Sequence, residues 1–183
     1  MIDVFGAAER SFTIPAPRAV AYEFYSSLPR IVPFLPRIEM VGKGSETIYR
    51  VAYRSLELNA YSVFIPCDLE VQIDETCRLL RIDHVDTTLF PKVEAHASLT
   101  SAVAQGKFRI RSHFYDDGPH QTRIEYSLGL SSTLPKPLGL LFVPASFMSN
   151  LVERIVNMRI NEIVDEFIHR STAAYPAWAS SRP

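Results

Sequence analysis

The chain has 183 residues, of which 47% are hydrophobic and 21% are charged, and its formal net charge at pH 7 is −1. This composition is typical of a folded globular protein and argues against a disordered chain. It also excludes a strongly basic nucleic-acid-binding protein, because no excess of Lys and Arg is present to neutralise phosphates. The length suits one domain with a substantial core, which we expect over residues 1–175 with a tail over residues 176–183.

Cysteine usage and the lack of long apolar runs indicate the compartment. Cys67 and Cys77 form no CxxC motif and are too few for a framework of disulfides. The N-terminal sequence has no basic segment followed by an apolar stretch. No run reaches the roughly 18 apolar residues that cross a membrane. We therefore expect a cytoplasmic protein in a reducing compartment.

The first predicted elements are a strand over residues 10–14 and a helix that begins near Pro17, where a proline is favourable in the first turn. Pro29 is expected to end this helix, because it lacks the N–H that a helix interior needs. The tetrapeptide Leu-Pro-Arg-Ile occupies residues 28–31 and occurs again at 35–38. No further matching units follow, so we interpret the two copies as a helix end and a turn into a strand.

A period of two dominates the middle of the chain, which predicts a long antiparallel sheet. The clearest hairpin turns at Asp116-Asp117-Gly118, and apolar residues alternate with polar ones in both of its arms. One face of the sheet is therefore expected to be buried and the other exposed. The predicted strands cover residues 38–43, 46–54, 56–65, 67–73, 79–85, 93–103, 107–115 and 121–130.

A long helix is predicted from about Ala145 to Ser171. Its apolar side chains follow one stripe at first and another from Ile160 onward, so either the two halves contact different surfaces or the helix bends near Arg159. A short helix, a long antiparallel sheet and a long terminal helix predict an α+β fold in which a curved sheet wraps around the last helix. The space between sheet and helix is a natural pocket for an apolar ligand.

Two parts of the chain resemble the SRPBCC superfamily, the helix-grip proteins that include START lipid-transfer domains, aromatase/cyclases and pollen-allergen-like carriers. They are Phe12 to Phe24, before the sheet, and the amphipathic terminal helix. Ile65 to Val71 and Leu140 to Arg159 are also similar to an uncharacterised family of cyanobacteria and plastid-bearing organisms, whose function is unknown. The resemblance implies the helix-grip fold and a hydrophobic pocket, and it names no ligand.

Apolar and aromatic residues on the alternating strand faces and on the helix predict the wall of this pocket. A fully packed core is the alternative, because alternation does not reveal whether an interior is hollow. The predicted ligand-binding residues are Tyr49, Val51, Tyr53, Phe64, Phe114, Tyr126, Met148, Ile155 and Arg159.

Arg159 is the polar candidate among them. Its guanidinium either holds a carboxylate or phosphate inside the pocket, or its stem packs on apolar surface while its head pairs with Glu162 or Glu166 on the next turn.

The sequence gives little support for catalysis. The five histidines have no spacing that gathers metal ligands, and no GxSxG motif occurs. Cys67 has no adjacent base and is expected to be a small core residue. His96 alternates with polar residues and is expected to face solvent rather than a polar pocket wall. We predict no catalytic residue, no metal and no cofactor.

Two apolar loops, residues 88–91 and Leu138 to Val143, either form an entrance and touch a membrane surface, or fold back onto the core. The leading hypothesis is a carrier or sensor of a small hydrophobic molecule such as a lipid, isoprenoid or pigment, with no nucleic acid as partner. Peripheral membrane contact is expected to use Leu138 to Val143. The alternatives are a cyclase-type enzyme acting on an apolar substrate, and a protein or membrane interaction module with a collapsed cavity.

Overall fold

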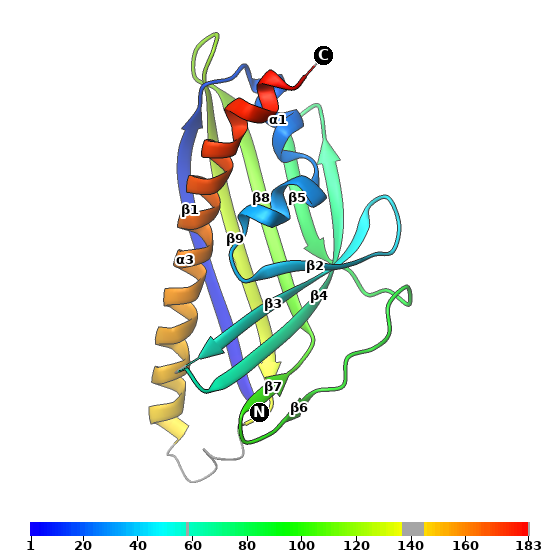
Figure 1. The fold of residues 1–183 in the computed structure, drawn as a ribbon, viewed down its shortest axis with the longest axis vertical. Helices are drawn as coiled ribbons and strands as arrows, with labels where there is room; N and C mark the ends of the chain where they lie inside the picture. The colour runs from blue at the N-terminus through cyan, green and yellow to red at the C-terminus, as the bar shows by residue number, and fades with distance from the viewer. Residues whose placement is uncertain (58, 137–144, 183) are drawn as a thin grey trace.

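The computed structural model describes residues 1–57, 59–136 and 145–182, with side chains of the last segment described from residue 150 onward. Within these residues nine strands form one sheet, and a long helix, α3, lies along it (Figure 1). The elements in chain order are β1 (Ile2–Ile14), α1 (Arg18–Tyr25), α2 (Leu28–Ile31), η1 (Val32–Phe34), β2 (Ile38–Lys43), β3 (Ile48–Glu57), β4 (Tyr61–Asp74), β5 (Leu79–His84), β6 (His96–Ala97), β7 (Ser101–Val103), β8 (Gly106–Asp116), β9 (Thr122–Leu134) and α3 (Ala145–Ser180).

The main path of the sheet has the strand order β1-β9-β8-β5-β4-β3-β2. Short β7 pairs in parallel with β4, and β6 pairs with β7. Helix α3 runs beside β1 along the full height of the molecule, and α1 lies near its C-terminal end (Figure 1). This architecture is the α+β helix-grip fold that the sequence predicts. No helix in the described part of the chain is long and apolar enough to cross a membrane.

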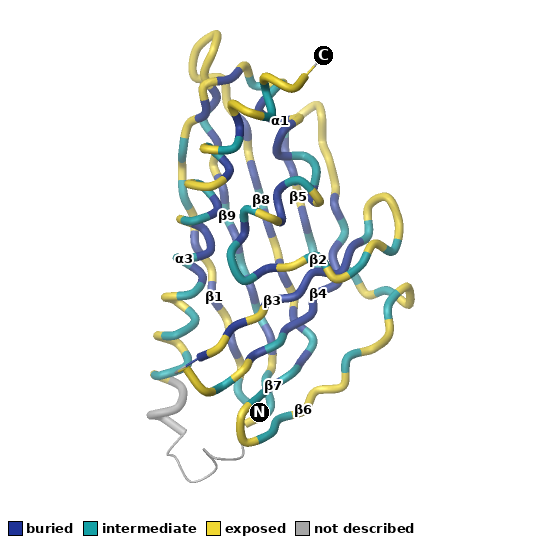
Figure 2. Tube along the Cα trace, viewed as in Figure 1, coloured by how far each residue is buried: buried dark blue, intermediate teal, exposed yellow. Residues whose placement is uncertain are grey.

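The predicted alternation of faces is confirmed in the β8–β9 hairpin. Phe108 and Ile110 are buried while Arg109 and His113 are exposed, and Tyr115 pairs across the hairpin with Arg123. The burial of β1 and β9 follows the same period, whereas the middle of β3 and of β4 is buried on both faces, over residues 49–53 and 65–69. The face of the sheet beneath α3 forms the core (Figure 2).

Strand β1 begins at Ile2, earlier than the predicted start at residue 10. Its first half contains Gly6 and Ala8, residue types with low strand propensity. A Cβ added at Gly6 would lie 2.6 Å from Cγ1 of Val156, so the glycine allows α3 to approach the strand closely. Small residues that weaken the strand signal in the sequence therefore form the surface on which α3 packs.

The two Leu-Pro-Arg-Ile copies have different structures. Helix α1 already ends at Tyr25, and Pro29 occupies the first turn of the next helix, α2. The expectation that Pro29 terminates the helix is therefore wrong, because a proline is tolerated where the N–H has no helical partner. In the second copy Arg37 adopts a left-handed conformation with φ of 63°, and Ile38 starts β2 as predicted.

The predicted strands 56–65 and 67–73 have wrong bounds, because the first spans the end of β3 and the turn at residues 59–60. From Tyr61 onward both belong to one strand, β4. The carbonyl oxygen of Phe64 accepts a hydrogen bond from the amide of Ala104, and that of Asp68 accepts one from the amide of Val85. Pro66 lies between these two residues on the same edge of β4. On this edge the neighbouring strand changes from β7, before Pro66, to β5, after it. A proline is tolerated at such an interruption of the ladder.

Helix α3 extends to Ser180, beyond the predicted end at Ser171. Trp178, near its end, packs against Phe24 of α1 with ring centroids 5.0 Å apart. The expected boundary between a domain ending at residue 175 and a tail stays a prediction, although the helix continues through it.

Candidate ligand-binding site

A cavity of about 320 Å³ lies between the sheet and the first half of α3. The walls come from the start of β1, the facing ends of β3 and β4, the region around β7 and the end of β9. In Figure 1 these elements meet at the end of the molecule that holds the N-terminus. The described lining residues are Ile2, Val4, Tyr53, Ser55, Glu57, Ala60, Tyr61, Val63, Ile65, Leu99, Ala102, Leu134, Pro135, Leu151, Val152, Ile155, Val156, Arg159, Ile160 and Ile163.

The helix supplies four aliphatic side chains to this cavity before its polar residue. Leu151, Val152, Ile155 and Val156 are each only partly buried, although they face the sheet. Met158, two residues beyond Val156, is 54% exposed and is not among the residues that line the cavity. The first apolar stripe of α3 therefore lines a space instead of filling it.

The cavity walls on the sheet side combine two tyrosines, Tyr53 and Tyr61, with small and medium side chains. Val63 and Ile65 of β4 are buried, and Ala102 of β7 adds only a methyl group. At the other end of the sheet, the rings of Phe24 and Tyr25 pack against α3. The two regions therefore differ in the side chains that occupy the space between sheet and helix.

One ion pair connects α3 to β3 at the cavity. Glu57, the last residue of β3, accepts hydrogen bonds from Arg159 of α3, with Nε–Oε1 at 3.1 Å and Nη2–Oε2 at 3.0 Å. The Tyr53 hydroxyl donates to Oε1 of the same carboxylate at 3.3 Å. The side chains of Glu57 and Arg159 are 10% and 19% exposed. The pair thus joins the strand to the helix at a largely buried position.

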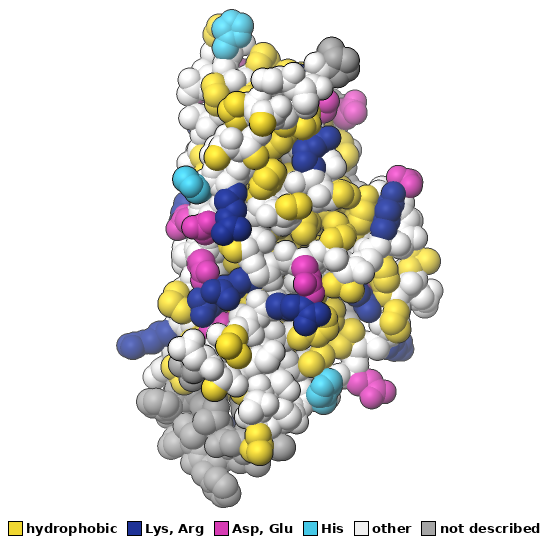
Figure 3. Space-filling view, in the orientation of Figure 1, with side chains coloured by type: hydrophobic (Ala, Val, Ile, Leu, Met, Phe, Trp, Pro, Cys, Tyr) yellow, Lys and Arg dark blue, Asp and Glu magenta, His cyan; other side chains and the backbone are white. Residues whose placement is uncertain are grey.

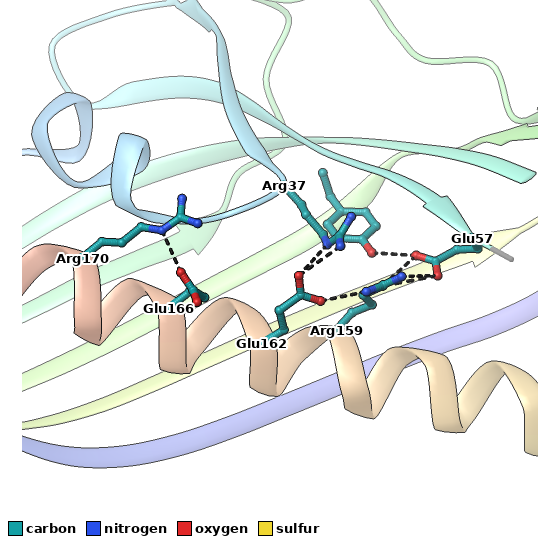
Figure 4. A network of polar contacts seen from close by, with 7 residues as sticks. Arg37, Glu57, Arg159, Glu162, Glu166 and Arg170 are labelled. Carbon is teal, nitrogen blue, oxygen red and sulfur yellow. Dashed lines mark hydrogen bonds and ion pairs between the residues drawn. The ribbon is translucent and has the colours of Figure 1, made fainter. Parts of the chain in front are cut away.

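The network continues along α3. Nη1 of Arg159 donates to Glu162 at 2.8 Å, and Arg37 donates to the other Glu162 oxygen at 3.0 Å and 3.1 Å. Figure 4 shows this chain of contacts, separate from the exposed pair of Glu166 with Arg170. Charged side chains of both signs gather across the middle of this face in Figure 3. Two cations and two anions make the four-residue network neutral.

The contacts of the network stabilise the charged forms of Glu57, Glu162 and Arg159. Burial raises the pKa of Glu57, but hydrogen bonds from Arg159 and from its neighbours outweigh it, so the pKa lies below its usual value. The pKa of Glu162 is lowered in the same way by Arg159 and Arg37 against the effect of burial. Hydrogen bonding to Glu57 raises the pKa of Arg159. Burial raises the pKa of Tyr53 to about 12.

Ser55 is the other polar residue of β3 that lines the cavity. It is 8% exposed, and its Oγ makes no hydrogen bond of ordinary geometry with any described residue. The hydroxyl is nevertheless close enough to Glu57 to contribute to the lowered pKa of that carboxyl group. The hydroxyl oxygen itself is fully buried, so Ser55 lines the cavity without adding free polar surface to it.

The structure brings together three of the nine predicted ligand-binding residues at the cavity, which are Tyr53, Ile155 and Arg159. For Arg159, pairing of the guanidinium with Glu162 agrees with the packing interpretation, and the additional pairing with Glu57 was not predicted. Glu166 pairs with Arg170 instead.

Five predicted residues lie outside the cavity lining. Tyr49 and Val51 are buried in the core, and the Tyr49 hydroxyl donates to the backbone of Glu46. Phe114 packs edge-on against Tyr22, away from the cavity lining.

Tyr126 stacks on Phe167 with centroids 4.8 Å apart, in the packed region of the core. Phe64 lies on the opposite face of the sheet beneath Arg54, because the β3–β4 register places Arg54 opposite Phe64 and Tyr53 opposite Ile65. Met148 falls outside the described side chains.

The first predicted entrance loop does not reach the cavity. Phe90 packs under the guanidinium of Arg50 at 4.8 Å, and Arg50 donates to the Pro91 carbonyl and pairs with buried Asp68. Residues 88–91 therefore fold back against the outer face of the sheet, as one of the two alternatives predicted. Leu138 to Val143 lie outside the described residues.

The described residues contain no cluster of acidic, histidine or cysteine side chains that could hold a metal ion. Cys67 is buried, and burial raises the pKa of its thiol to about 12, which agrees with the prediction of a core residue. His96 is exposed, as expected for a surface position.

Sequence reasoning missed Ser55 and Glu57. They continue the inward-facing alternation of Tyr53, and a charged residue at the end of an apolar strand face was the signal that could have identified them. Leu56, which lies between them in the strand, is 54% exposed and faces the opposite side.

No protein-family model matches the chain, and no curated protein matches it. Solved structures do match. The protein TTHA0849 from Thermus thermophilus shares 18% identity over 94% of this chain and 98% of its own, with a TM-score of 0.52. The Zhui aromatase/cyclase from Streptomyces sp. R1128 shares 11% identity over 97% of this chain and 95% of its own, with a TM-score of 0.55.

Human STARD10 has a TM-score of 0.57 and 8% identity over 96% of this chain and 66% of its own. At these identities the likenesses show a common fold and no shared activity. The chain has the helix-grip fold, and its membership of the SRPBCC superfamily and of the narrower cyanobacterial and plastid family stays a prediction.

Proposed function

We propose that the protein binds one small hydrophobic molecule in the cavity between the sheet and the first half of α3. The observation that carries this proposal is the apolar lining of a cavity of about 320 Å³, within the range of small-molecule sites. The aliphatic side chains Leu151, Val152, Ile155 and Val156 retain exposed surface there. A bound apolar molecule would remove this surface from water, which is favourable in proportion to the area.

The ligand would be a lipid, an isoprenoid or a pigment, held for transport or for sensing. The fold supports this proposal by analogy, since the resembling superfamily includes lipid-transfer domains and carriers. The expected contact with a membrane surface through Leu138 to Val143 stays part of the proposal, as does a cytoplasmic location.

The ionisation of the cavity does not favour cyclase-type acid–base catalysis. A general acid or base works best with a pKa near the operating pH. Glu57 is held ionised, while Arg159 and Tyr53 are held protonated, so these three groups do not exchange protons readily at neutral pH. Binding without reaction therefore explains the described site with fewer assumptions.

The test compares two single substitutions on α3 in the full chain. Ile155→Trp fills the cavity, whereas Met158→Trp places the same side chain on an exposed part of the helix. The neutral apolar dye N-phenylnaphthylamine is titrated into each protein and followed by fluorescence. We expect wild type and Met158→Trp to bind the dye with the same affinity and Ile155→Trp to lose at least tenfold.

Equal binding to all three proteins would place the dye elsewhere and contradict the proposal. Native mass spectrometry of gently purified wild-type protein adds an independent measurement, because a co-purified mass would identify the ligand class. We expect that mass to be absent from the Ile155→Trp protein and retained by Met158→Trp.

A further inference from the structure

We propose that the ligand is an uncharged molecule and that Glu57 determines this specificity, because its carboxylate neutralises Arg159 at the cavity wall. The inference rests on the proposed function and names the chemical class of the ligand. An isoprenoid hydrocarbon or a neutral ester belongs to this class, whereas a free fatty acid or a lipid phosphate does not. The proposal replaces the expectation that Arg159 holds a carboxylate or phosphate.

The described cavity wall offers a ligand very little free polar surface. Its charged side chains are Glu57 and Arg159, and its hydroxyl groups belong to Tyr53, Ser55 and Tyr61. The Tyr53 hydroxyl donates to Glu57, and the Tyr61 hydroxyl donates to a backbone carbonyl of β7 at 2.9 Å. The Ser55 hydroxyl oxygen is fully buried. A polar headgroup would therefore depend on the ion pair for its contacts with the described wall.

Arg159 is already matched in charge by carboxylates of the protein. Its Nε and Nη2 donate to Glu57 at 3.1 Å and 3.0 Å, and its Nη1 donates to Glu162 at 2.8 Å. Arg37 pairs with Glu162 as well, so two cations balance two anions in this network. A guanidinium has five N–H donors, and these contacts leave two of the Arg159 donors available. An anion that accepted from them would lie close to the carboxylates that hold the same guanidinium.

The charge of Glu57 opposes such an anion. The carboxylate is 10% exposed, and its lowered pKa keeps it ionised at neutral pH. Two like charges repel strongly in a poorly hydrated site, and the ligand would also lose its own hydration. A cationic ligand meets the converse obstacle, because Glu57 already holds the guanidinium of Arg159. An uncharged molecule avoids both costs and still gains from the burial of apolar surface.

The same charge count predicts how the specificity can be changed. Without Glu57, the network of Arg37, Arg159 and Glu162 carries one excess positive charge at the cavity. If Arg159 is removed together with Glu57, the network is neutral again. The preference between a neutral and an anionic ligand should therefore follow the net charge of the network, while the apolar wall stays the same.

The experiment compares methyl decanoate with decanoate, two molecules that share one chain and differ in charge, and adds decylammonium as the cation. Each displaces N-phenylnaphthylamine from the full-length protein at neutral pH. We expect the wild type to bind the ester at least tenfold more tightly than either ion, because the ions must give up hydration without gaining an unpaired counter-charge.

Substitutions then assign this preference to Glu57. In Glu57→Ala the ratio of the decanoate affinity to the methyl decanoate affinity should rise at least tenfold, and the added volume affects both ligands alike. Glu57→Leu combined with Arg159→Met should return the ratio to its wild-type value. The matched control Glu166→Ala breaks the exposed pair with Arg170, outside the cavity lining, and should leave the ratio unchanged. A purely structural role of Glu57 would change both affinities together.

Glu162→Gln gives a second variant, which keeps the test decisive if Glu57→Ala does not fold. The Glu162 side chain is 32% exposed, so its substitution disturbs the buried core less. It also leaves one excess positive charge on the network, at a more hydrated position. The decanoate ratio should rise in the same direction, by about threefold.

The outcomes separate this inference from the proposed function. Decanoate binding to the wild type as tightly as the ester overturns the inference while cavity binding stands, and so does a ratio that these single substitutions of Glu57 and Glu162 leave unchanged. If Ile155→Trp binds the dye as the wild type does, the proposed function fails, and this inference with it.

Discussion

The two halves of α3 contact the same sheet and differ in what they find there. From Val164 to Tyr175 its inward side chains are buried in a region that holds aromatic rings of α1, β9 and the helix itself. From Leu151 to Val156 the inward side chains are only partly buried and line a cavity. A single helix on a single sheet therefore has a filled region and a hollow one.

The comparison shows which elements decide the filling. Helix α1 and η1 insert Tyr22, Phe24, Tyr25 and Phe34 between the sheet and the second half of α3. In the hollow region no described aromatic ring from another helix enters, and the network of Glu57, Arg159 and Glu162 connects helix to strand instead. We conclude that the curvature of the sheet makes the space and that α1 fills only one end of it.

The largest contrast is expected from truncation. Phe167→Ala removes a ring that is 1% exposed and stacked on Tyr126, and should lower the free energy of unfolding by about 4 kcal/mol. Ile155→Ala removes a partly exposed side chain beside an existing cavity and should cost about 1 kcal/mol. Urea unfolding measures both. Equal losses would mean that the two halves are packed alike.

Substitutions that enlarge a side chain should also destabilise the filled half of α3 more than the half that lines the cavity. Val164 is completely buried, so Val164→Trp overpacks a filled core and should cost about 3 kcal/mol. Ile155→Trp places the same ring in the cavity and should change the free energy of unfolding by less than about 1 kcal/mol. A severe loss for Ile155→Trp in the same urea titrations would show that the cavity cannot accept added volume.

Breaking the polar connection should have a smaller effect. Arg159→Met leaves the largely buried Glu57 carboxylate without its ion pair and should cost about 2 kcal/mol. The double substitution Arg159→Met with Glu57→Leu should recover most of this loss, because no buried charge is then left unpaired.

The matched control for this pair is Arg170→Met on the same helix, which breaks the exposed pair with Glu166 and should cost less than about 0.5 kcal/mol. If Arg159→Met and Arg170→Met lower the free energy of unfolding by similar amounts, the Glu57–Arg159 pair contributes no more than an exposed ion pair. Urea unfolding at neutral pH is the measurement.

The smallest effect is expected from pH. The pKa values of Glu57 and Glu162 are lowered in the folded protein, so the folded state binds fewer protons than the unfolded one as the solution is acidified. Their contribution is present above the ordinary Glu pKa of about 4.3 and is lost as the pH falls through the lowered values. Urea unfolding at about pH 6 and about pH 3 should show the wild type losing about 1 kcal/mol more than Arg159→Met. If the difference in the free energy of unfolding between wild type and Arg159→Met is the same at both pH values, the pairing with Arg159 does not lower the pKa of these carboxyl groups.

Much of the fold could be predicted because it follows from local periodicity. The β8–β9 hairpin has an uninterrupted period of two and the terminal helix has helical periodicity with one change of stripe, and the structure confirms the presence of both elements. The start of β1 could not be recognised, because Gly6 and Ala8 are selected for contact with α3 rather than for strand propensity. Pro66 led to the prediction of two strands where the structure has one, β4. The proline is tolerated because it lies where the neighbour of β4 changes from β7 to β5.

The site was predictable in part for a related reason. Tyr53, Ile155 and Arg159 were placed on the correct faces by their own strand and helix, and these elements line the cavity. Phe64 was placed on the wrong face, because alternation within β4 does not specify its phase relative to β3. Tyr126 faces inward as expected, but it lies where aromatic residues from other elements already fill the core.

The sequence by itself determined the main order of helix, sheet and terminal helix, the buried face of the β8–β9 hairpin and the apolar character of the interior, since these depend on neighbours along the chain. The tertiary structure alone decided where the interior is hollow, which residues line it, and that Glu57 neutralises Arg159. Those properties depend on register and on residues far apart in sequence, such as the 102 positions that separate this pair. The periodicity of apolar residues shows which face of its strand or helix a residue occupies. Which side chains that residue contacts depends on how the elements pack.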